Sequence, residues 1–297
     1  MHDQAEKLRK LVQDSSKNSG GKQVKRDKNT RIIAVTSGKG GVGKTNFTLN
    51  LAISLNKLGY SCIVFDADIG FANIDVISGV IPKHTIADVV TGNKKMREII
   101  EATPSGVRII SGGSGINEIM RLDISKIEYL INEFKTLENE ADYILIDTGA
   151  GLSNTVLSFV NSADEIIVVT TPEPTSLTDG YAMIKALTLY NPSVSIKMII
   201  NRVSSPKEAD EVFEKLNKVT SRFLNVEIIN LGYIYDSKVL IDAVKNQTPF
   251  LEYSPSSSIS KNINSIAVKL VGVEKNTENN MNNFLSNLRN VFTKGRL

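Results

Sequence analysis

The 297-residue chain has no tryptophan, a single cysteine and no long apolar run. One thiol, that of Cys62, can form neither an internal disulfide bond nor a thiolate metal cluster, so a reducing cytoplasm is the expected compartment. No stretch reaches the roughly 18 consecutive apolar residues that a membrane-spanning helix needs. The N-terminal sequence MHDQAEKLRK is too polar for a secretory signal peptide. We therefore expect a cytoplasmic protein.

The chain also has little net charge, +3, but that charge is unevenly distributed. Residues 1–30 carry 8 basic and 4 acidic side chains, a net charge of +4. Residues 31–280 carry 24 and 28, a net charge of −4, and residues 281–297 carry 3 and none, a net charge of +3. A mildly acidic body disfavours broad electrostatic binding to DNA, and we expect no sequence-specific nucleic acid partner.

From Arg31 onward, short apolar runs alternate with longer helical segments, such as 44–58, 124–137, 176–190 and 206–223. Continuous apolar runs are typical of strands buried on both faces of a parallel sheet. The runs are 31–36, 61–66, 107–111, 143–147, 165–171, 196–201 and 227–232. This alternation predicts an α/β fold with a doubly wound, mostly parallel sheet and helices on both faces.

The composition divides the chain into one α/β domain and two helical extensions. The domain is expected over residues 31–273. Polar segments at 14–30 and 274–280 have the composition of linkers. They connect the domain to a short N-terminal helix, 1–13, and to an apolar-striped C-terminal helix, 281–297.

The strongest motif is a glycine-rich run that follows the first predicted strand and opens a helix. It has the P-loop spacing, Gly38-x₄-Gly43-Lys44-Thr45. Glycines let backbone N–H groups surround phosphates, and the helix N-terminus adds positive potential. Lys44 is expected to reach the β- and γ-phosphates, and the Thr45 hydroxyl to ligate Mg²⁺. The predicted nucleotide-binding residues of this run are Gly38, Lys39, Gly40, Gly41, Val42, Gly43, Lys44, Thr45 and Asn46.

Carboxylates that end two other predicted strands complete a metal site. Asp147 ends the apolar run from Tyr143 and is expected to hold Mg²⁺, while Asp66 and Asp68 end the run from Ser61. Strand ends of doubly wound sheets face the ligand crevice. One of the second pair can join the metal shell, and Asp68, nearer the loop, is the better candidate to orient water. The alternative is that these carboxylates cap a turn or a helix.

The run from Lys39 to Thr45 resembles the deviant Walker A motif of the MinD/ParA ATPases, and residues 65–70 and 147–151 resemble their switch regions. The resemblance implies Mg²⁺ and ATP as cofactors, sandwiched between two subunits. It also implies that Lys39 reaches the partner's phosphates and that Asp68 is the hydrolytic aspartate. Asn201 and Arg202 match the position where the family holds adenine. The GTP-reading Asn-Lys-x-Asp motif is absent, which favours ATP.

The N-terminal motif Asp3-Gln4-Ala5-x-x-Leu8-Arg9 is similar to the signature of the FlhG (YlxH) branch of that family. The resemblance implies control of flagellar number and placement, an FlhF-like GTPase as partner, and a central role for Gln4. Asp3, Gln4, Leu8 and Arg9 are then the partner-binding residues. Flagellar basal-body proteins are further candidate partners.

Read physically, residues 1–13 form too short a helix to be stable alone, so this segment would fold on a partner. From composition alone it is a disordered basic start.

The tail 281–297 gathers apolar residues on one side of a helix, the pattern of a helix that lies in a membrane interface. The residues expected to enter the membrane are Phe284, Leu285, Leu288, Val291 and Phe292. Flanking basic residues favour an anionic surface, so we expect peripheral attachment to the inner face of the cell membrane in the ATP-bound state. The alternative is a helix that docks on the body, which an ATP-free monomer would favour.

Other functions on the same scaffold stay open. They are a MinD-type division-site ATPase, a ParA-type partition ATPase, a metabolic or electron-transfer enzyme, and a scaffold that does not hydrolyse ATP. Nitrogenase-iron-protein-like members need cysteines for a shared cluster, and Cys62 is alone. The segment Thr171-Pro172-Glu173-Pro174 predicts a rigid loop near the crevice, with a nucleotide or dimer contact only weakly indicated.

Overall fold

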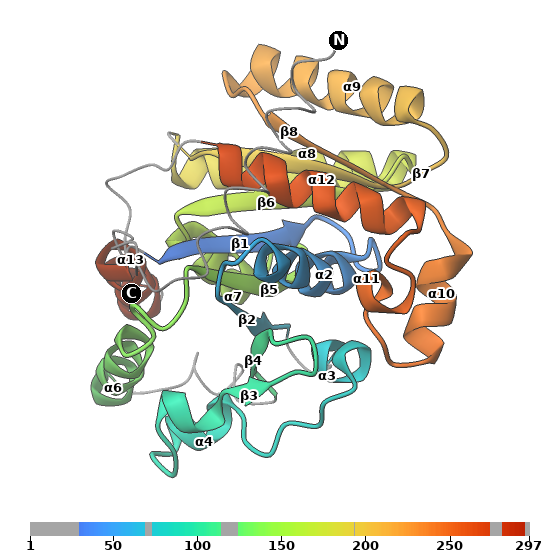
Figure 1. The fold of residues 1–297 in the computed structure, drawn as a ribbon. Coiled ribbons are helices and arrows are strands. Elements are labelled where there is room, and N and C mark those ends of the chain that lie inside the picture. The colour runs from blue at the N-terminus through green and yellow to red at the C-terminus, as the bar shows by residue number, and fades with distance from the viewer. Residues whose placement is uncertain (1–29, 69–72, 114–123, 193, 274–280, 295–297) are drawn as a thin grey trace.

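The computed structural model describes residues 30–68, 73–113, 124–192, 194–273 and 281–294. Within them the chain forms an eight-stranded sheet of order β3-β4-β2-β5-β1-β6-β7-β8 (Figure 1). All pairs are parallel except β3 with β4. The strands are β1 (Arg31–Ser37), β2 (Cys62–Ala67), β3 (Glu101–Ala102), β4 (Arg108–Ser111), β5 (Tyr143–Ala150), β6 (Glu165–Thr170), β7 (Ile196–Val203) and β8 (Ile229–Tyr235). The predicted α/β class is confirmed.

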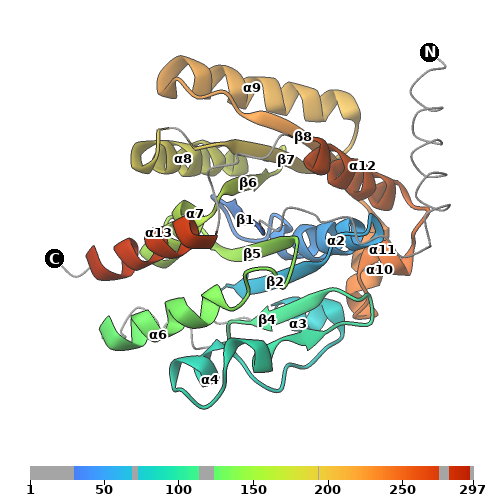
Figure 2. The same ribbon diagram turned by 60° about the vertical axis from the view of Figure 1, so that its left-hand side comes forward.

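Helices cover both faces of this sheet. They are α2 (Lys44–Lys57), α3 (Asn73–Ser78), α4 (Ile86–Val90), the 3₁₀ helix η1 (Met96–Ile99), α6 (Ile124–Lys135), α7 (Asn154–Ser162), α8 (Pro174–Tyr190), α9 (Pro206–Leu224), α10 (Lys238–Lys245), α11 (Phe250–Tyr253), α12 (Ser258–Gly272) and α13 (Met281–Lys294). Helices α2 and α12 pack on one face, whereas α6, α7, α8 and α9 cover the other (Figures 1 and 2).

The alternation of side chains along β1 supplies both cores. Ile33 and Val35 point toward α2 and α12, whereas Ile32 and Ala34 point to the opposite face. Because every residue of β1 is buried, the strand has the continuous apolar pattern expected at the centre of a parallel sheet. The carboxyl end of this strand is therefore fixed between two packed layers, directly below the glycine-rich run.

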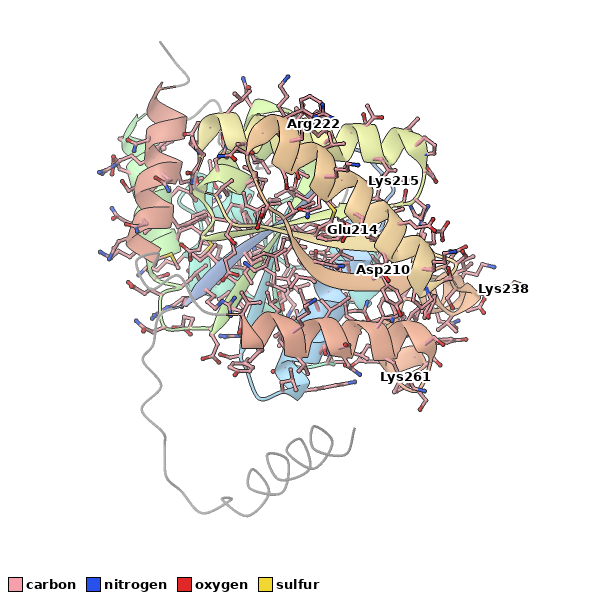
Figure 3. The ribbon with its side chains drawn as sticks, turned by 90° about the horizontal axis from the view of Figure 1, so that it is seen from above. Asp210, Glu214, Lys215, Arg222, Lys238 and Lys261 are labelled. Carbon is pink, nitrogen blue, oxygen red and sulfur yellow. The ribbon has the colours of Figure 1, made fainter. Side chains whose placement is uncertain are left out.

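Helix α9 shows how local signals set the outer elements. The Ser205 side chain caps its first turn, and Pro206 occupies the first helical position, where its missing N–H group costs nothing. The helix ends at Asn225, whose backbone is left-handed. Charged side chains such as Asp210 and Glu214 line its outer side (Figure 3). The apolar stripe therefore faces the sheet.

Some element bounds differ from those predicted. Strand β5 continues through the polar residues to Ala150, because its partner β1 continues pairing to Ser37. Strand β8 begins at Ile229 and extends to Tyr235, beyond the predicted end at residue 232, because it follows the longer strand β7. The antiparallel pairing of β3 joins two residues only and was not predicted.

The C-terminal helix α13 packs against the body, beside α6 and α7 (Figure 2). Met281, Phe284, Leu285 and Leu288 are all buried there, and the Phe284 ring meets that of Phe134 edge to face. An ion pair between Arg289 and Glu128 closes the outer side. The docked arrangement is the alternative that the amphipathic pattern left open, and a membrane role stays a prediction. The side chains of Val291 and Phe292 lie outside the described residues.

A buried ion cluster lies at the amino ends of the central strands. Glu165 on β6 accepts hydrogen bonds from Arg31 at 2.6 and 2.7 Å and pairs with Lys197 on β7 at 2.8 Å. Burial alone would raise the pKa of Glu165, but the Arg31 hydrogen bonds and the Lys197 charge hold it below its ordinary value. Arg31 also donates to the carbonyl of Leu270, in the last turn of α12. The cluster thus joins β1, β6, β7 and α12.

We predict that Glu165→Gln destabilises the protein by about 3–5 kcal/mol, because it leaves Arg31 and Lys197 buried without their counter-charge. Urea denaturation followed by circular dichroism measures this loss. The matched control is Glu214→Gln on the exposed side of α9, which should change the free energy of unfolding by less than about 0.5 kcal/mol. Equal stability of the two variants would contradict the assignment of a structural role to the cluster.

Candidate functional site

The P-loop connects β1 to α2 and requires glycine at its last turn. Gly43, the residue before α2, has a φ of 95°, a left-handed conformation that favours glycine. A Cβ atom at this position would lie 2.4 Å from Nδ2 of Asn201. Helix α2 begins at Lys44 with no acidic residue in its first turn, so its free N–H groups face the loop. The loop has the backbone of an anion-binding site.

Two residues at the end of β7 hold the rim of this loop. Asn201 donates from Nδ2 to the carbonyl of Val42 at 2.7 Å, and Arg202 donates from Nη2 to the carbonyl of Gly41 at 2.7 Å. Arg202 has a φ of 60°, unusual for a residue with a side chain, and its N–H group donates to Oδ1 of Asn201. Both predicted base-binding residues therefore lie beside the P-loop.

A small pocket lies next to these residues, beside the P-loop. Its lining combines the P-loop side with apolar groups, namely Gly43, Asn46, Phe47, Asn201, Tyr235 and Leu240. The Oδ1 atom of Asn46 is buried there without a hydrogen-bond partner. An unsatisfied amide oxygen is costly, and an exocyclic amine of a base would satisfy it. Asn46, which the sequence predicts to bind nucleotide, therefore lies in the lining of this pocket.

The Lys44 amine lies inside the loop and is held by a residue that the sequence motifs did not indicate. Its Nζ donates to Oγ of Ser37 at 3.0 Å, and Ser37 donates to the carbonyl of Lys39 at 2.7 Å. Burial lowers the pKa of Lys44, and the nearby carboxylates of Asp147 and Asp68 oppose that shift. Phosphate oxygens would supply the negative charge that this buried ammonium group lacks.

Two carboxylates lie side by side at the carboxyl ends of β2 and β5. Asp66 and Asp147 are paired in the register of these strands, and their side chains are 2% and 0% exposed. Burial, followed by the charge of Asp147, raises the pKa of Asp66 to about 8. Burial also raises the pKa of Asp147 to about 6, against hydrogen bonds from Thr45 and Thr48. The Oδ2 atoms of both carboxylates have no hydrogen-bond partner.

These oxygens fit a magnesium ion. Mg²⁺ prefers carboxylate and hydroxyl oxygens and usually shares its shell with phosphate and water. Asp66, Asp147 and Thr45 offer such a set, and Thr48, which was not predicted, donates to Oδ1 of Asp147 at 3.3 Å and orients it. When bound, the cation would neutralise charge on the phosphates. Among the described residues no three His, Cys, Asp or Glu side chains form a metal-binding group by themselves.

Asp68 lies just beyond this pair. Its N–H group donates to Oδ1 of Asp66 at 3.0 Å, and its own Oδ1 would lie 2.9 Å from a Cβ atom at Gly149. The carboxylate is therefore at the end of β5, near Lys44 and Asp147. It is only partly buried, so a water molecule can approach it. This position suits the predicted role in orienting water.

Lys39 points away from the phosphate loop. Its Nζ donates to Oε2 of Glu173 at 2.9 Å and to Oγ1 of Thr175 at 3.0 Å. Both partners lie at the start of α8, where the sequence predicts a rigid loop near the crevice with a nucleotide or dimer contact as a further interpretation. A single chain does not test whether Lys39 reaches a second subunit.

The remaining predicted residues lie elsewhere. Asp3, Gln4, Leu8 and Arg9 are outside the described residues, so their role stays a prediction. In the part of the chain that the structure describes, no helix is both long and apolar enough to span a bilayer.

Comparisons with known proteins show the family to which the chain is similar. A family model described as ParA, NUBPL iron-transfer P-loop NTPase, matches residues 28–271. The antiactivator FleN of Pseudomonas aeruginosa is 41% identical over 241 residues, 81% of this chain and 86% of the relative. The flagellum site-determining protein YlxH of Helicobacter pylori is 40% identical over 246 residues, 82% of each chain. The solved structure of the septum site-determining protein MinD from Pyrococcus horikoshii, complexed with Mg-ADP, has a TM-score of 0.66 at 29% identity and covers 83% of this chain and 99% of that chain.

The raised pKa of Asp66 predicts that the protein without Mg²⁺ and nucleotide loses stability as the pH rises. The ordinary pKa is 3.8 and the folded value is about 8, so the folded state holds an additional proton between these values. The contribution of this proton to the free energy of unfolding is fully present below the ordinary pKa. It falls, by at most about 1.4 kcal/mol per pH unit, as the pH rises to the folded pKa. Urea denaturation between about pH 5 and pH 8 should show this slope, and Asp66→Asn should flatten it. An equal slope in both proteins would contradict the prediction.

Proposed function

The chain belongs to the MinD/ParA family of P-loop ATPases, and from that premise we propose that it is an ATP-driven switch that controls flagellar number and placement. The assembly of Lys44, Asp66 and Asp147 around the P-loop supports the part of the proposal that concerns ATP hydrolysis. Flagellar control is supported by the two flagellar relatives, at 41% and 40% identity. The similarity extends over most of this chain and most of each relative, which supports a shared role and not only a shared scaffold.

Hydrolysis of ATP uses the residues in the roles that their positions suit. Lys44 and the backbone N–H groups from Gly38 to Thr45 bind the phosphates. Thr45, Asp66 and Asp147 would hold Mg²⁺, and Asp68 orients the water that attacks the γ-phosphorus. The bond to the β-phosphate oxygen breaks, and ADP and phosphate leave. Asn46, Asn201 and Arg202 retain the base end of the nucleotide.

In the proposed cycle, ATP brings two subunits together and Lys39 of each contacts the phosphates bound by the other. The N-terminal segment 1–13, tethered by residues 14–30, contacts an FlhF-like GTPase through Asp3, Gln4, Leu8 and Arg9. Basal-body proteins are further candidate partners of the body, 31–273.

The tail 281–297 follows the linker 274–280, leaves its docked position and enters an anionic membrane surface on the inner side of the cell membrane. Leaving the body exposes side chains whose burial contributes about 1.5–3 kcal/mol each, and the apolar membrane interior offsets that loss.

The most informative test is a GTPase assay with an FlhF-like protein and a peptide of residues 1–13. We expect the peptide to stimulate GTP hydrolysis and Gln4→Ala to abolish the stimulation, because a side-chain amide can orient the attacking water. Gln13→Ala, outside the signature motif, is the matched control and should stimulate like the unchanged peptide. No stimulation, or stimulation that survives Gln4→Ala, would sink this part of the proposal.

Membrane attachment is tested by co-sedimentation with anionic vesicles in the presence of a non-hydrolysable ATP analogue. Phe284→Asp should remove binding, because it places a charge in the apolar stripe of α13. Asn287→Asp adds the same charge on the exposed side of that helix and should retain most of the binding. If Phe284→Asp binds vesicles as well as the unchanged protein, the tail does not insert into the membrane.

A division-site function is the second candidate. MinD of Thermotoga maritima is 31% identical over 282 residues, 89% of this chain and 97% of that protein. The two functions differ in the partner, so the GTPase assay also separates them: a division-site ATPase has no reason to stimulate an FlhF-like GTPase.

A further inference from the structure

Glu173 and Thr175 hold the amine of Lys39 in a position that the proposed reaction does not use. The two acceptors lie 2.9 and 3.0 Å from Nζ of Lys39. An ammonium group has three donors, so only one remains for any other ligand. The hydrogen bond from Lys39, with its charge, holds the pKa of Glu173 below the ordinary value, and Arg202 adds to the effect.

The backbone around Glu173 is rigid, so the contact does not depend on a chance meeting of two flexible chains. Glu173 is the residue before α8 and stands between two prolines, whose rings fix the local φ angles. Ser176, in the first turn of α8, connects this helix to the end of β6. Its Oγ accepts a hydrogen bond from the N–H group of Thr171 at 3.1 Å and forms another with the hydroxyl of Thr170 at 3.0 Å. The carboxylate is therefore presented from a fixed helix start.

The other side of the contact is equally constrained. Gly38 packs so closely on α8 that a Cβ atom would lie 2.0 Å from the carbonyl oxygen of Asp179. This packing fixes the first residue of the P-loop against α8, the helix that Glu173 directly precedes. The backbone of Lys39, the next residue, is thus held at a set distance from the carboxylate.

The exposure of the pair makes it exchangeable. The side chains of Lys39 and Glu173 are 40% and 55% exposed, and exposed ion pairs contribute little to folding. A triphosphate carries more negative charge than one carboxylate, so it can displace Glu173 from the amine. A contact of this kind is weak enough to break in each cycle.

We propose that Glu173 and Thr175 form a resting position for Lys39, which competes with nucleotide phosphate for the amine and so raises the ATP concentration at which two subunits associate. The inference rests on the proposed function, because it takes from there the use of Lys39 between subunits. Glu173 and Thr175 act through Lys39 and are positioning residues. Without them the amine is available at lower ATP.

Two measurements test the resting position. The first compares the reductive methylation of Lys39 by formaldehyde and cyanoborohydride in nucleotide-free protein, with the modified peptides quantified by mass spectrometry. Glu173→Gln should raise the rate at Lys39 about two- to fivefold, the range of an exposed ion pair, and leave the other lysines unchanged. Glu214→Gln, which removes an exposed carboxylate from α9, is the matched control and should not change it.

The second measurement is the concentration of a non-hydrolysable ATP analogue at which half of the protein associates, followed by analytical ultracentrifugation. Glu173→Gln should lower this midpoint about two- to fivefold, and Thr175→Val should lower it by a smaller factor. Thr175→Val keeps the test valid if the first variant folds poorly.

The outcomes separate this inference from the proposed function. If the unchanged protein does not associate at any analogue concentration, the proposed pairing of subunits is wrong. The methylation rates at Lys39 still test whether Glu173 holds the amine. Methylation equal in Glu173→Gln and the unchanged protein overturns the inference. A faster methylation with an unchanged or higher midpoint also overturns it, because Glu173 then does not compete with phosphate.

Discussion

The burial of two neighbouring carboxylates is the central constraint on this structure. Asp66 and Asp147 lie directly opposite one another near the carboxyl ends of neighbouring strands, and both are almost fully buried. Burying two carboxylates side by side is unfavourable unless one takes up a proton or a cation joins them. The Lys44 ammonium group, also buried, faces the same place. Mg²⁺ would neutralise the two buried carboxylates, and nucleotide phosphate would neutralise the buried ammonium group. The P-loop, the pocket beside it and the loop around Asp68 surround the place where these ligands would bind.

The opposite end of the sheet, at the amino ends of the central strands, holds charged groups that are paired with one another. There Glu165 pairs with Arg31 and Lys197, and Arg31 reaches the last turn of α12 through Leu270. Residues 30 and 273, which border the two linkers, directly precede β1 and directly follow α12. A satisfied ion cluster thus anchors the places where the extensions leave the body, while the unsatisfied groups are kept at the nucleotide end.

The sequence predicted the sheet correctly, and the residues that it proposed for the nucleotide site are ones that the fold brings together, for physical reasons. A P-loop needs glycine at fixed positions, and strand-end carboxylates of a parallel sheet meet at one edge. Ser37 and Thr48 were not assigned roles, and the contact of Glu173 with Lys39 was not predicted, because single polar residues in different segments carry no spacing signal until the fold brings them together. The apolar stripe of α13 fits a membrane and a protein surface equally well, so amphipathicity alone could not decide between them.

The central claim is that Asp66 and Asp147 hold a cation together with the nucleotide. The most direct test is the affinity for ATP with and without Mg²⁺, in the unchanged protein and in Asp147→Asn. We predict that Mg²⁺ tightens binding by about tenfold or more in the unchanged protein, the effect of a charge-assisted contact, and only slightly in the variant. A variant that keeps the full effect of Mg²⁺ would contradict this account of the site.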